Sequence, residues 1–404
     1  MVGKNAERLE ALFREHFGSP TVGAVRAQAP GRMELAGNHT DHQGGKVISA
    51  ATTQNVQVMA CPNEQRRINL LMEGYGSATI YLDEADWRSP RDEERNTSCS
   101  IVRGMAALFE EAGGALRGFD MVTCSDIPPG AGLSSSAAFE MAVGSALSKL
   151  FSSTARTWES AMDLTMAGVV AEQRYFGKPC GAQDQMTSAH GGVVFMDFKS
   201  SVPDVSPIEF DAASCGHTFC IVDSRSDHSR FTAEFAQITR EMGDVARALG
   251  VGRLGDSPVG TFLQRLPELR TRLGDRPCLR ALHFYDEDRR VKQQHEALMQ
   301  GNFQVFLQQA RLSGASSAQY LQNVSPYTKD GTEQPALVIM GLCAHLLGDC
   351  GAWRIHGGGF GGSVLAVVPD DRLDHFVSEM NAALGYDACL LVDIGAPGAR
   401  AFRL

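Results

Sequence analysis

The sequence lacks a long apolar run, a surplus of basic residues and any paired-cysteine motif. No stretch of its 404 residues approaches the roughly 18 apolar residues that a transmembrane helix needs, so we expect no membrane partner. Lys and Arg number 37 against 47 Asp and Glu, a formal charge of −10, and this balance does not fit a nucleic-acid-binding protein. An anionic ligand must therefore be held by local groups.

Cysteine is present but follows no pattern. The ten cysteines form no CxxC pair and no regular framework, and the first residues do not resemble a signal peptide. Such usage is typical of reduced thiols. We therefore expect a soluble protein of the cytoplasm.

Periodic apolar residues predict a mixture of helices and strands. Residues 6–18 have helical spacing, and the rest of the first hundred residues are rich in strand patterns. Helices become frequent from residue 98, while residues 250–280, rich in Arg, Gly and Pro, fit either a loop or a short helix. A chain of this length exceeds one compact core. Because strands and helices are segregated as much as alternated, we predict an α+β fold with two domains.

The segment GRMELAGNHTDHQGG, residues 31–45, gathers polar side chains around glycines. His39, Asp41 and His42 could ligate a metal, but no third ligand group with zinc-like spacing stands out elsewhere. A polyol with several hydroxyls would use the same mixture of carboxylate acceptors and amide or imidazole donors. This segment favours a polyol ligand, with zinc as the alternative.

Two glycine-rich segments predict close approach of the backbone to a ligand. In PPGAGLSSSAAFE, residues 128–140, the glycines expose backbone N–H groups and three serines lead into a helix whose N-terminus favours negative charge. The Walker spacing GxxxxGK[ST] is absent, and the alternative is a tight turn with a serine N-cap. In HGGGFGGS, residues 356–363, so many glycines are hard to explain as packing, because each costs conformational entropy.

Glu172 and Asp184 belong to the segment EQRYFGKPCGAQDQ and could be brought together by a helix and the loop after it. A carboxylate near a phosphate-binding loop suggests a Mg²⁺ ligand, and one near a hydroxyl suggests a base. Either residue alone could also be a solvated acid. The segment therefore leaves three roles open.

Four segments, in this order, resemble the GHMP family of small-molecule kinases and, within it, the galactokinases. APGRMELAGNHTDHQGG is similar to the family signature PGRVNLIGEHTDYNGG, and PPGAGLSSSAA is similar to the family's phosphate loop. CGAQDQ resembles the segment CGIMDQ, and GAWRIHGGGFGGS resembles GARMTGAGFGGC. Four ordered motifs across nearly the whole chain are more specific than any one of them.

This resemblance implies a two-domain GHMP kinase fold with the active site between the domains. Residues 1–195 correspond to an N-terminal domain like ribosomal protein S5 domain 2, and residues 196–404 to a ferredoxin-like C-terminal domain. The resemblance also implies ATP and Mg²⁺, with Asp184 as the catalytic base and Arg32 beside it. It places Asn38, His39, Asp41, Gly181 and Phe235 at the sugar, Gly130, Ala131, Gly132, Leu133, Ser134, Ser135 and Ser136 at the ATP phosphates, and Ser136 and Glu172 at Mg²⁺.

Departures from the family form include the positions of Asn38, His42 and Phe235. Galactokinases carry Glu at the position of Asn38 and Tyr at that of His42, and a loose alignment places Phe235 where they carry Tyr. An amide at Asn38 no longer repels a carboxylate, which would admit galacturonate. The segment DHQGG is also similar to plant galacturonokinases.

These features together predict a sugar-1-kinase whose partners are a hexose and ATP, not nucleic acid or a membrane. We expect a galactokinase, with galacturonate or another sugar as the alternative substrate. A catalytically silent, sugar-sensing relative usually has a disrupted phosphate loop, whereas the segment GLSSSAA is intact here.

Overall fold

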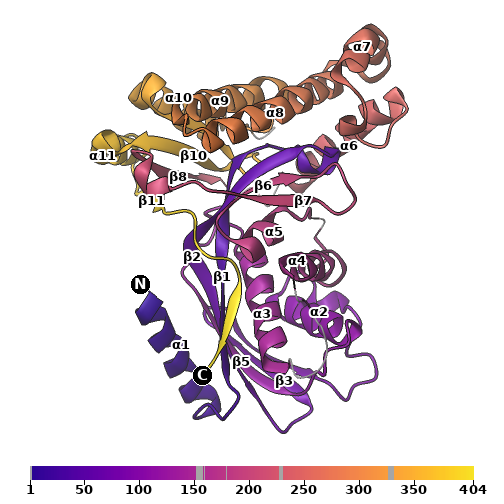
Figure 1. Cartoon of the computed structure of the whole chain (residues 1–404), viewed down its shortest axis with the longest axis vertical. Coiled ribbons are helices and arrows are strands. Elements are labelled where there is room, and N and C mark those ends of the chain that lie inside the picture. Colours follow the sequence, from indigo (N-terminus) through magenta and orange to yellow (C-terminus); the bar gives the residue numbers. More distant parts are fainter. Residues whose placement is uncertain (1, 152–157, 159, 179, 227–230, 326–331) are drawn as a thin grey trace.

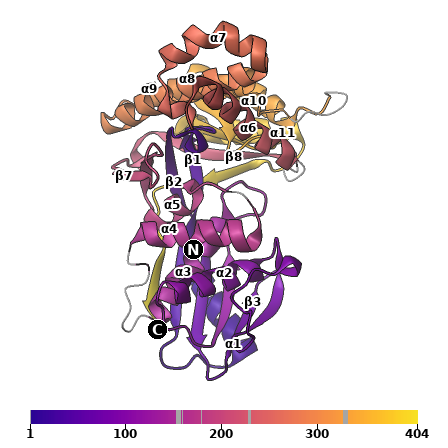
Figure 2. The same cartoon turned by 90° about the vertical axis from the view of Figure 1, so that its right-hand side faces the viewer.

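The computed structural model describes residues 2–151, 158, 160–178, 180–226, 231–325 and 332–404. A lower body is built on a large sheet, and an upper body places long helices over a smaller sheet (Figure 1). Figure 2 shows the same two bodies from the side. All ten cysteines are free thiols, and none of the described helices is long and apolar enough to span a membrane.

The sheet of the lower body contains eight of the described strands. Their order is β12-β1-β2-β5-β3-β4, and β6 pairs with another part of β2 and carries β7 at its outer edge. Only the β3·β5 pair is parallel. The strands are β1 (Val25–Ala36), β2 (Lys46–Pro62), β3 (Arg67–Met72), β4 (Gly76–Tyr81), β5 (Phe119–Ser125), β6 (Val193–Asp197), β7 (Asp204–Ile208) and β12 (Arg400–Arg403).

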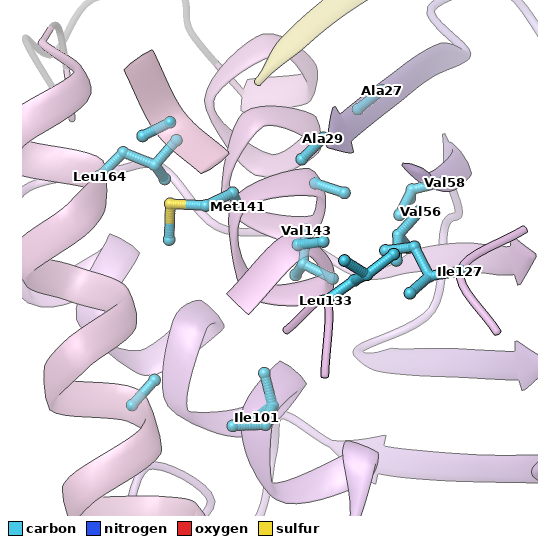
Figure 3. Close-up of a cluster of buried hydrophobic side chains, with 14 of the residues drawn as sticks. Ala27, Ala29, Val56, Val58, Ile101, Ile127, Leu133, Met141, Val143 and Leu164 are labelled. Atoms are coloured by element: carbon cyan, nitrogen blue, oxygen red, sulfur yellow. The ribbon is translucent and has the colours of Figure 1, made fainter. Parts of the chain in front are cut away.

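Helices cover both faces of this sheet. On one face α1 (Val2–Phe17), the helix predicted from residues 6–18, buries Leu9 and Phe13 against β2 and β5. On the other face α3 (Ser135–Phe151) packs on β1 and β2 and contributes to the main core (Figure 3). Three further helices lie beside α3, namely α2 (Ser98–Glu111), α4 (Ala161–Val170) and α5 (Gln183–His190).

The upper body contains an antiparallel sheet of order β11-β8-β10-β9. Residues 250–280, which the sequence left open between loop and short helix, form a 15-residue helix and the start of a 25-residue one. The strands are β8 (His217–Ser226), β9 (Ala352–His356), β10 (Gly362–Pro369) and β11 (Cys389–Val392). The helices are α6 (Thr232–Leu249), α7 (Val259–Leu273), α8 (Asp275–Met299), α9 (Phe303–Ser316), α10 (Pro335–Leu347) and α11 (Leu373–Leu384).

Strands from the second half of the chain belong to the lower sheet, which bears on where a domain boundary can lie. The division expected after residue 195 falls inside β6, whose residues pair with β2 in the lower sheet. The last strand, β12, also returns to that sheet beside β1. We propose a boundary between β7 and β8, with the final strand counted in the first domain.

The hairpin of β1 and β2 carries residues 37–45 up to the second body. Both strands run from the lower sheet towards the long helices (Figure 1), and α8 packs against β2. The turn between β1 and β2 is stabilised locally, because Thr40 Oγ1 donates to the carbonyl oxygens of Gly37 and Lys46. The polar segment singled out in the sequence therefore lies where the two bodies meet.

Candidate active site

An ion pair between a buried arginine and a half-buried aspartate lies at the centre of the candidate site. Arg32 comes from β1 and Asp184 from the first turn of α5. Arg32 Nε lies 2.6 Å from Asp184 Oδ1, and Nη2 lies 3.1 Å from Oδ2. Two parallel bonds hold the guanidinium and the carboxylate in one mutual orientation. The two residues predicted to be catalytic are thus brought together across 152 positions of the chain.

An irregularity in β1 aims Arg32 at the predicted phosphate loop. The register of β1 against β2 shifts immediately before Arg32, and such bulges redirect side chains. A Cβ at Gly31 would lie 2.7 Å from the carbonyl oxygen of Leu133, so glycine permits this close approach. The Arg32 backbone N–H donates to that same carbonyl at 2.9 Å, and its Nη1 donates to the Gly132 carbonyl at 2.6 Å. One arginine therefore positions both the loop and Asp184.

Asp184 is held in its ionised form. Burial raises the pKa of Asp184, but the Arg32 guanidinium, the hydroxyl of Ser134 and the charge of Lys178 together outweigh burial, and the pKa lies below its usual value. The Ser134 hydroxyl donates to Asp184 Oδ2 at 2.5 Å. At neutral pH the carboxylate is therefore available to accept a hydrogen bond.

Replacing Arg32 by Leu should raise the pKa of Asp184, because Ser134 and Lys178 alone then oppose the effect of burial. In the natural protein Asp184 stays ionised down to a pH below the usual Asp pKa of about 3.9, so it causes no fall in kcat at mildly acidic pH. In the variant, kcat should fall as the pH drops, by about tenfold for each pH unit below the raised pKa.

Profiles of kcat against pH for the natural protein, Arg32→Leu and Arg32→Lys test this expectation. The lysine variant retains the positive charge, so its profile should lie closer to that of the natural protein. Profiles of the same shape for all three proteins would contradict the electrostatic role of Arg32.

The predicted phosphate loop precedes α3, which begins at Ser135. Both glycines of the loop have positive φ, 78° and 74°, and Ser134 has φ 53°, a conformation that costs free energy in a residue other than glycine. Leu133 anchors the loop in the core near Ile127 and Val143 (Figure 3). A glycine turn at a helix N-terminus suits an oxyanion. The loop and the first turn of α3 together contain the seven residues predicted to bind ATP phosphates, Gly130, Ala131, Gly132, Leu133, Ser134, Ser135 and Ser136.

Ser136 and Glu172, the predicted magnesium ligands, lie together. Ser136 Oγ donates to Glu172 Oε1 at 3.4 Å. Glu172 is buried in a π-helical turn, residues 171–176, that continues α4. Lys178 Nζ lies 3.2 Å from Oε1, and Gln185 Nε2 donates to Oε2 at 2.7 Å. Hydroxyl and carboxylate oxygens are the ligands that Mg²⁺ prefers, so this pair fits the predicted ion.

Four of the five residues predicted at the sugar lie close together. His39 and Asp41 belong to the turn of residues 37–45, and Gly181 and Phe235 lie against them. A Cβ on Gly181 would lie 2.5 Å from Asp41 Oδ2, and the rings of His39 and Phe235 have centroids 6.2 Å apart. Burial raises the pKa of Asp41 against the opposing effect of His39, and the charge of Asp184 raises it further. The signature loop and the ion pair are thus close enough for their charges to interact.

No group of three or more His, Cys, Asp or Glu side chains that could hold a metal occurs in the described part of the chain, so the zinc alternative gains no support.

Asn38, the fifth residue predicted at the sugar, is engaged elsewhere. Its Oδ1 accepts from Ser317 Oγ at 3.2 Å and from Asn323 Nδ2 at 2.8 Å. Its Nδ2 donates to the Gly357 carbonyl at 2.6 Å and to Glu34 Oε1 at 3.4 Å. The side chain is completely buried, and its two donor and two acceptor positions are all occupied. Three of these four partners tie the amide to the second body, so a sugar would have to compete with them for it.

Sequence reasoning missed a buried ion pair beside Asn38. Glu34 of β1 accepts from Arg354 Nη2 of β9 at 2.6 Å and from Gln183 Nε2 at 3.2 Å. In the family form PGRVNLIGEHTDYNGG, Asn stands at the position of Glu34 and Glu at that of Asn38, so acid and amide have exchanged places in this chain. The exchange is visible by alignment, but only the structure shows that the two side chains touch.

Comparison with known proteins identifies two matching family models. The GHMP kinases N terminal domain matches residues 100–192, and the galactokinase galactose-binding signature matches residues 11–62. The chain thus contains a GHMP kinase N-terminal domain and a galactokinase galactose-binding signature. It is 28% identical over 367 residues to a galactokinase of Actinobacillus pleuropneumoniae serotype 3 (strain JL03), covering 90% of this chain and 89% of that protein.

Solved structures share the fold of this chain. It matches Lactococcus lactis galactokinase complexed with galactose at a TM-score of 0.82 and 24% identity, over 99% of this chain and 100% of that one. It matches Methanococcus jannaschii mevalonate kinase at 0.63 and 15% identity, over 96% and 100% of the two chains. The predicted two-domain α+β kinase fold is confirmed.

Proposed function

We propose that this protein is a galactokinase that transfers the γ-phosphoryl group of ATP to the C1 hydroxyl of galactose, giving galactose 1-phosphate and ADP. The observation that carries the proposal is the Arg32–Asp184 pair, which joins the phosphate loop to the surroundings of the sugar-signature loop. The galactose-binding signature at residues 11–62 and relatives named galactokinase support the choice of sugar.

Phosphoryl transfer requires a positioned hydroxyl, a site for its proton and neutralisation of phosphate charge. Asp184 accepts the C1 hydroxyl proton as the new O–P bond forms and the bond to ADP breaks. Arg32 orients that carboxylate and lies beside the loop, where its charge stabilises phosphoryl oxygens. Ser136 and Glu172 would hold Mg²⁺, which neutralises charge on the ATP phosphates. The backbone N–H groups of residues 130–136 bind those phosphates.

The sugar itself is assigned to His39, Asp41, Gly181 and Phe235. Asp41 supplies acceptor oxygens for hydroxyl donors, and the Phe235 ring supplies an apolar surface. The galacturonate alternative depended on a free amide at Asn38, and that amide is occupied within the protein. Galactose therefore remains the proposed substrate.

Incubation with ATP, Mg²⁺ and a panel of galactose, galacturonate, glucose, N-acetylgalactosamine and arabinose tests the proposal. ADP release should be fastest with galactose, and galactose 1-phosphate should be the product. Chelation with EDTA should abolish turnover, and added Mg²⁺ should restore it. A higher kcat/KM for another sugar would overturn the choice of galactose. A rate of ADP release that does not increase when any sugar of the panel is added would overturn the kinase assignment.

A further inference from the structure

We propose that His42 is a specificity-determining residue, which donates a hydrogen bond from Nε2 to an oxygen of the bound sugar. The inference rests on the proposed sugar-kinase function and deepens it. His42 follows Asp41 in a single 3-10 turn, residues 41–43. It stands where the family form PGRVNLIGEHTDYNGG has Tyr.

A chain of hydrogen bonds determines which ring nitrogen of His42 carries the proton. The backbone N–H of Leu254, in the 3-10 turn that precedes α7, donates to Gln43 Oε1 at 3.1 Å. Because a backbone N–H can only donate, the Gln43 amide is oriented with Nε2 towards His42, and Nε2 lies 3.2 Å from His42 Nδ1. Nδ1 must therefore accept, and the proton of the neutral ring is on Nε2.

The ring remains neutral, so it offers one donor and no free acceptor. Burial and the neighbouring His39 lower the pKa of His42 to about 3. A tyrosine hydroxyl at this position could both donate and accept, whereas His42 can only donate. Its ligand must therefore present an acceptor atom.

His42 Nε2 is shielded from solvent and has no hydrogen-bond partner among the residues that the structure describes. Buried donors are almost always paired, and leaving one unpaired costs free energy unless a ligand accepts its hydrogen. The ring centroid lies 5.6 Å from that of His39 in a T-shaped contact. The backbone N–H of His42 also donates to the Asp41 carboxylate. The unpaired donor thus belongs to the cluster assigned to the sugar, and a neutral, oxygen-rich hexose fits it.

The variants His42→Asn and His42→Gln separate the two ring nitrogens. The shorter amide reaches the position of Nδ1 and removes the donor, while the longer one reaches that of Nε2 and retains it. The KM for galactose should rise about tenfold in His42→Asn and stay within about threefold of natural in His42→Gln. Because His42 is assigned to the sugar only, kcat and the KM for ATP should change little in both variants.

The deoxygalactoses lacking the 2-, 3-, 4- or 6-hydroxyl identify the oxygen. To the natural protein, one analogue should bind about tenfold more weakly than galactose. To His42→Asn, the same analogue should bind as tightly as galactose does, because this variant lacks the Nε2 donor that the missing hydroxyl would have paired with. Dissociation constants from calorimetry give this comparison without turnover, and thermal unfolding shows whether both variants are folded.

Equal affinities of all three proteins for galactose, or the same penalty for every analogue in natural and variant protein, would overturn the role of His42. Failure of the proposed function is a separate result, since the natural protein would then prefer another sugar of the panel. The same variants are in that case compared on the preferred sugar.

Discussion

Replacing Asp184 by Asn should lower kcat by about 10²–10⁴-fold, the range that a positioned general base contributes. The amide is nearly isosteric and retains one oxygen for Arg32, so the site keeps its shape. It cannot take the proton of the C1 hydroxyl, and it removes the charge that the buried guanidinium neutralises. Sugar affinity should change little, because the sugar contacts are assigned to other residues. Steady-state kinetics and galactose calorimetry measure the two quantities separately.

The chain offers a matched control for this substitution. Arg270 Nε lies 2.6 Å from Asp275 Oδ1, the same distance as in the Arg32–Asp184 pair, but both side chains are exposed. Exposed pairs contribute little to stability, and this one joins the end of α7 to the start of α8. Asp275→Asn should leave kcat at its natural value. Near-normal turnover in Asp184→Asn, with sugar binding intact, would refute the role of Asp184 as base.

Replacing Asn38 by Glu should destabilise the protein by roughly 3–5 kcal/mol, the cost of a buried charge without its own partner. The new carboxylate would lie beside that of Glu34 and would face the Gly357 carbonyl, where the natural amide donates. Arg354 is already paired with Glu34 through Nη2, and the charge of one guanidinium cannot offset two carboxylates. The free energy of unfolding in urea measures the loss. From the sequence alone, the expected effect of a carboxylate at this position was on the choice of sugar, because it would repel the carboxylate of galacturonate.

The double variant Glu34→Asn with Asn38→Glu restores one acid and one amide in the order of the family form. Since Asn38 Nδ2 lies 3.4 Å from Glu34 Oε1, the two sites are coupled. The double variant should recover about 0.5–3 kcal/mol relative to the sum of the single variants. Strict additivity of the single losses would show that the exchange of acid and amide is not one coupled change.

Several elements followed directly from local sequence. The helix α1 has its apolar residues on one face, and the strands β1 to β5 carry β-branched and alternating apolar residues. The start of α3 at Ser135 was predictable because serines and glycines precede an apolar-periodic run.

Other elements depended on distant partners. The strand β12 has four residues and pairs with β1 from the opposite end of the chain, and so short a segment carries little pattern of its own. α7 contains Pro267, which disfavours a helix interior, yet the burial of Phe262 and Leu269 supports it. Residues 157–177 have helical spacing, and residue 157 lies outside the described part. Within this segment α4 continues into a π-helical turn that places Glu172, which helical spacing alone does not predict.

The sequence by itself determined the family and the chemical inventory, because four ordered motifs specify which residue types stand in each loop. It also indicated the nearness of Arg32 and Asp184, through the resemblance alone. Only the tertiary structure decided which of these side chains remain available to a ligand. Asn38 and His42 lie four positions apart and both looked like ligand groups. Three contacts with the second body and one with Glu34 occupy the side chain of Asn38, whereas one donor of His42 is left unpaired among the described residues. The reason is that hydrogen-bond saturation depends on partners hundreds of residues away, which local sequence does not specify.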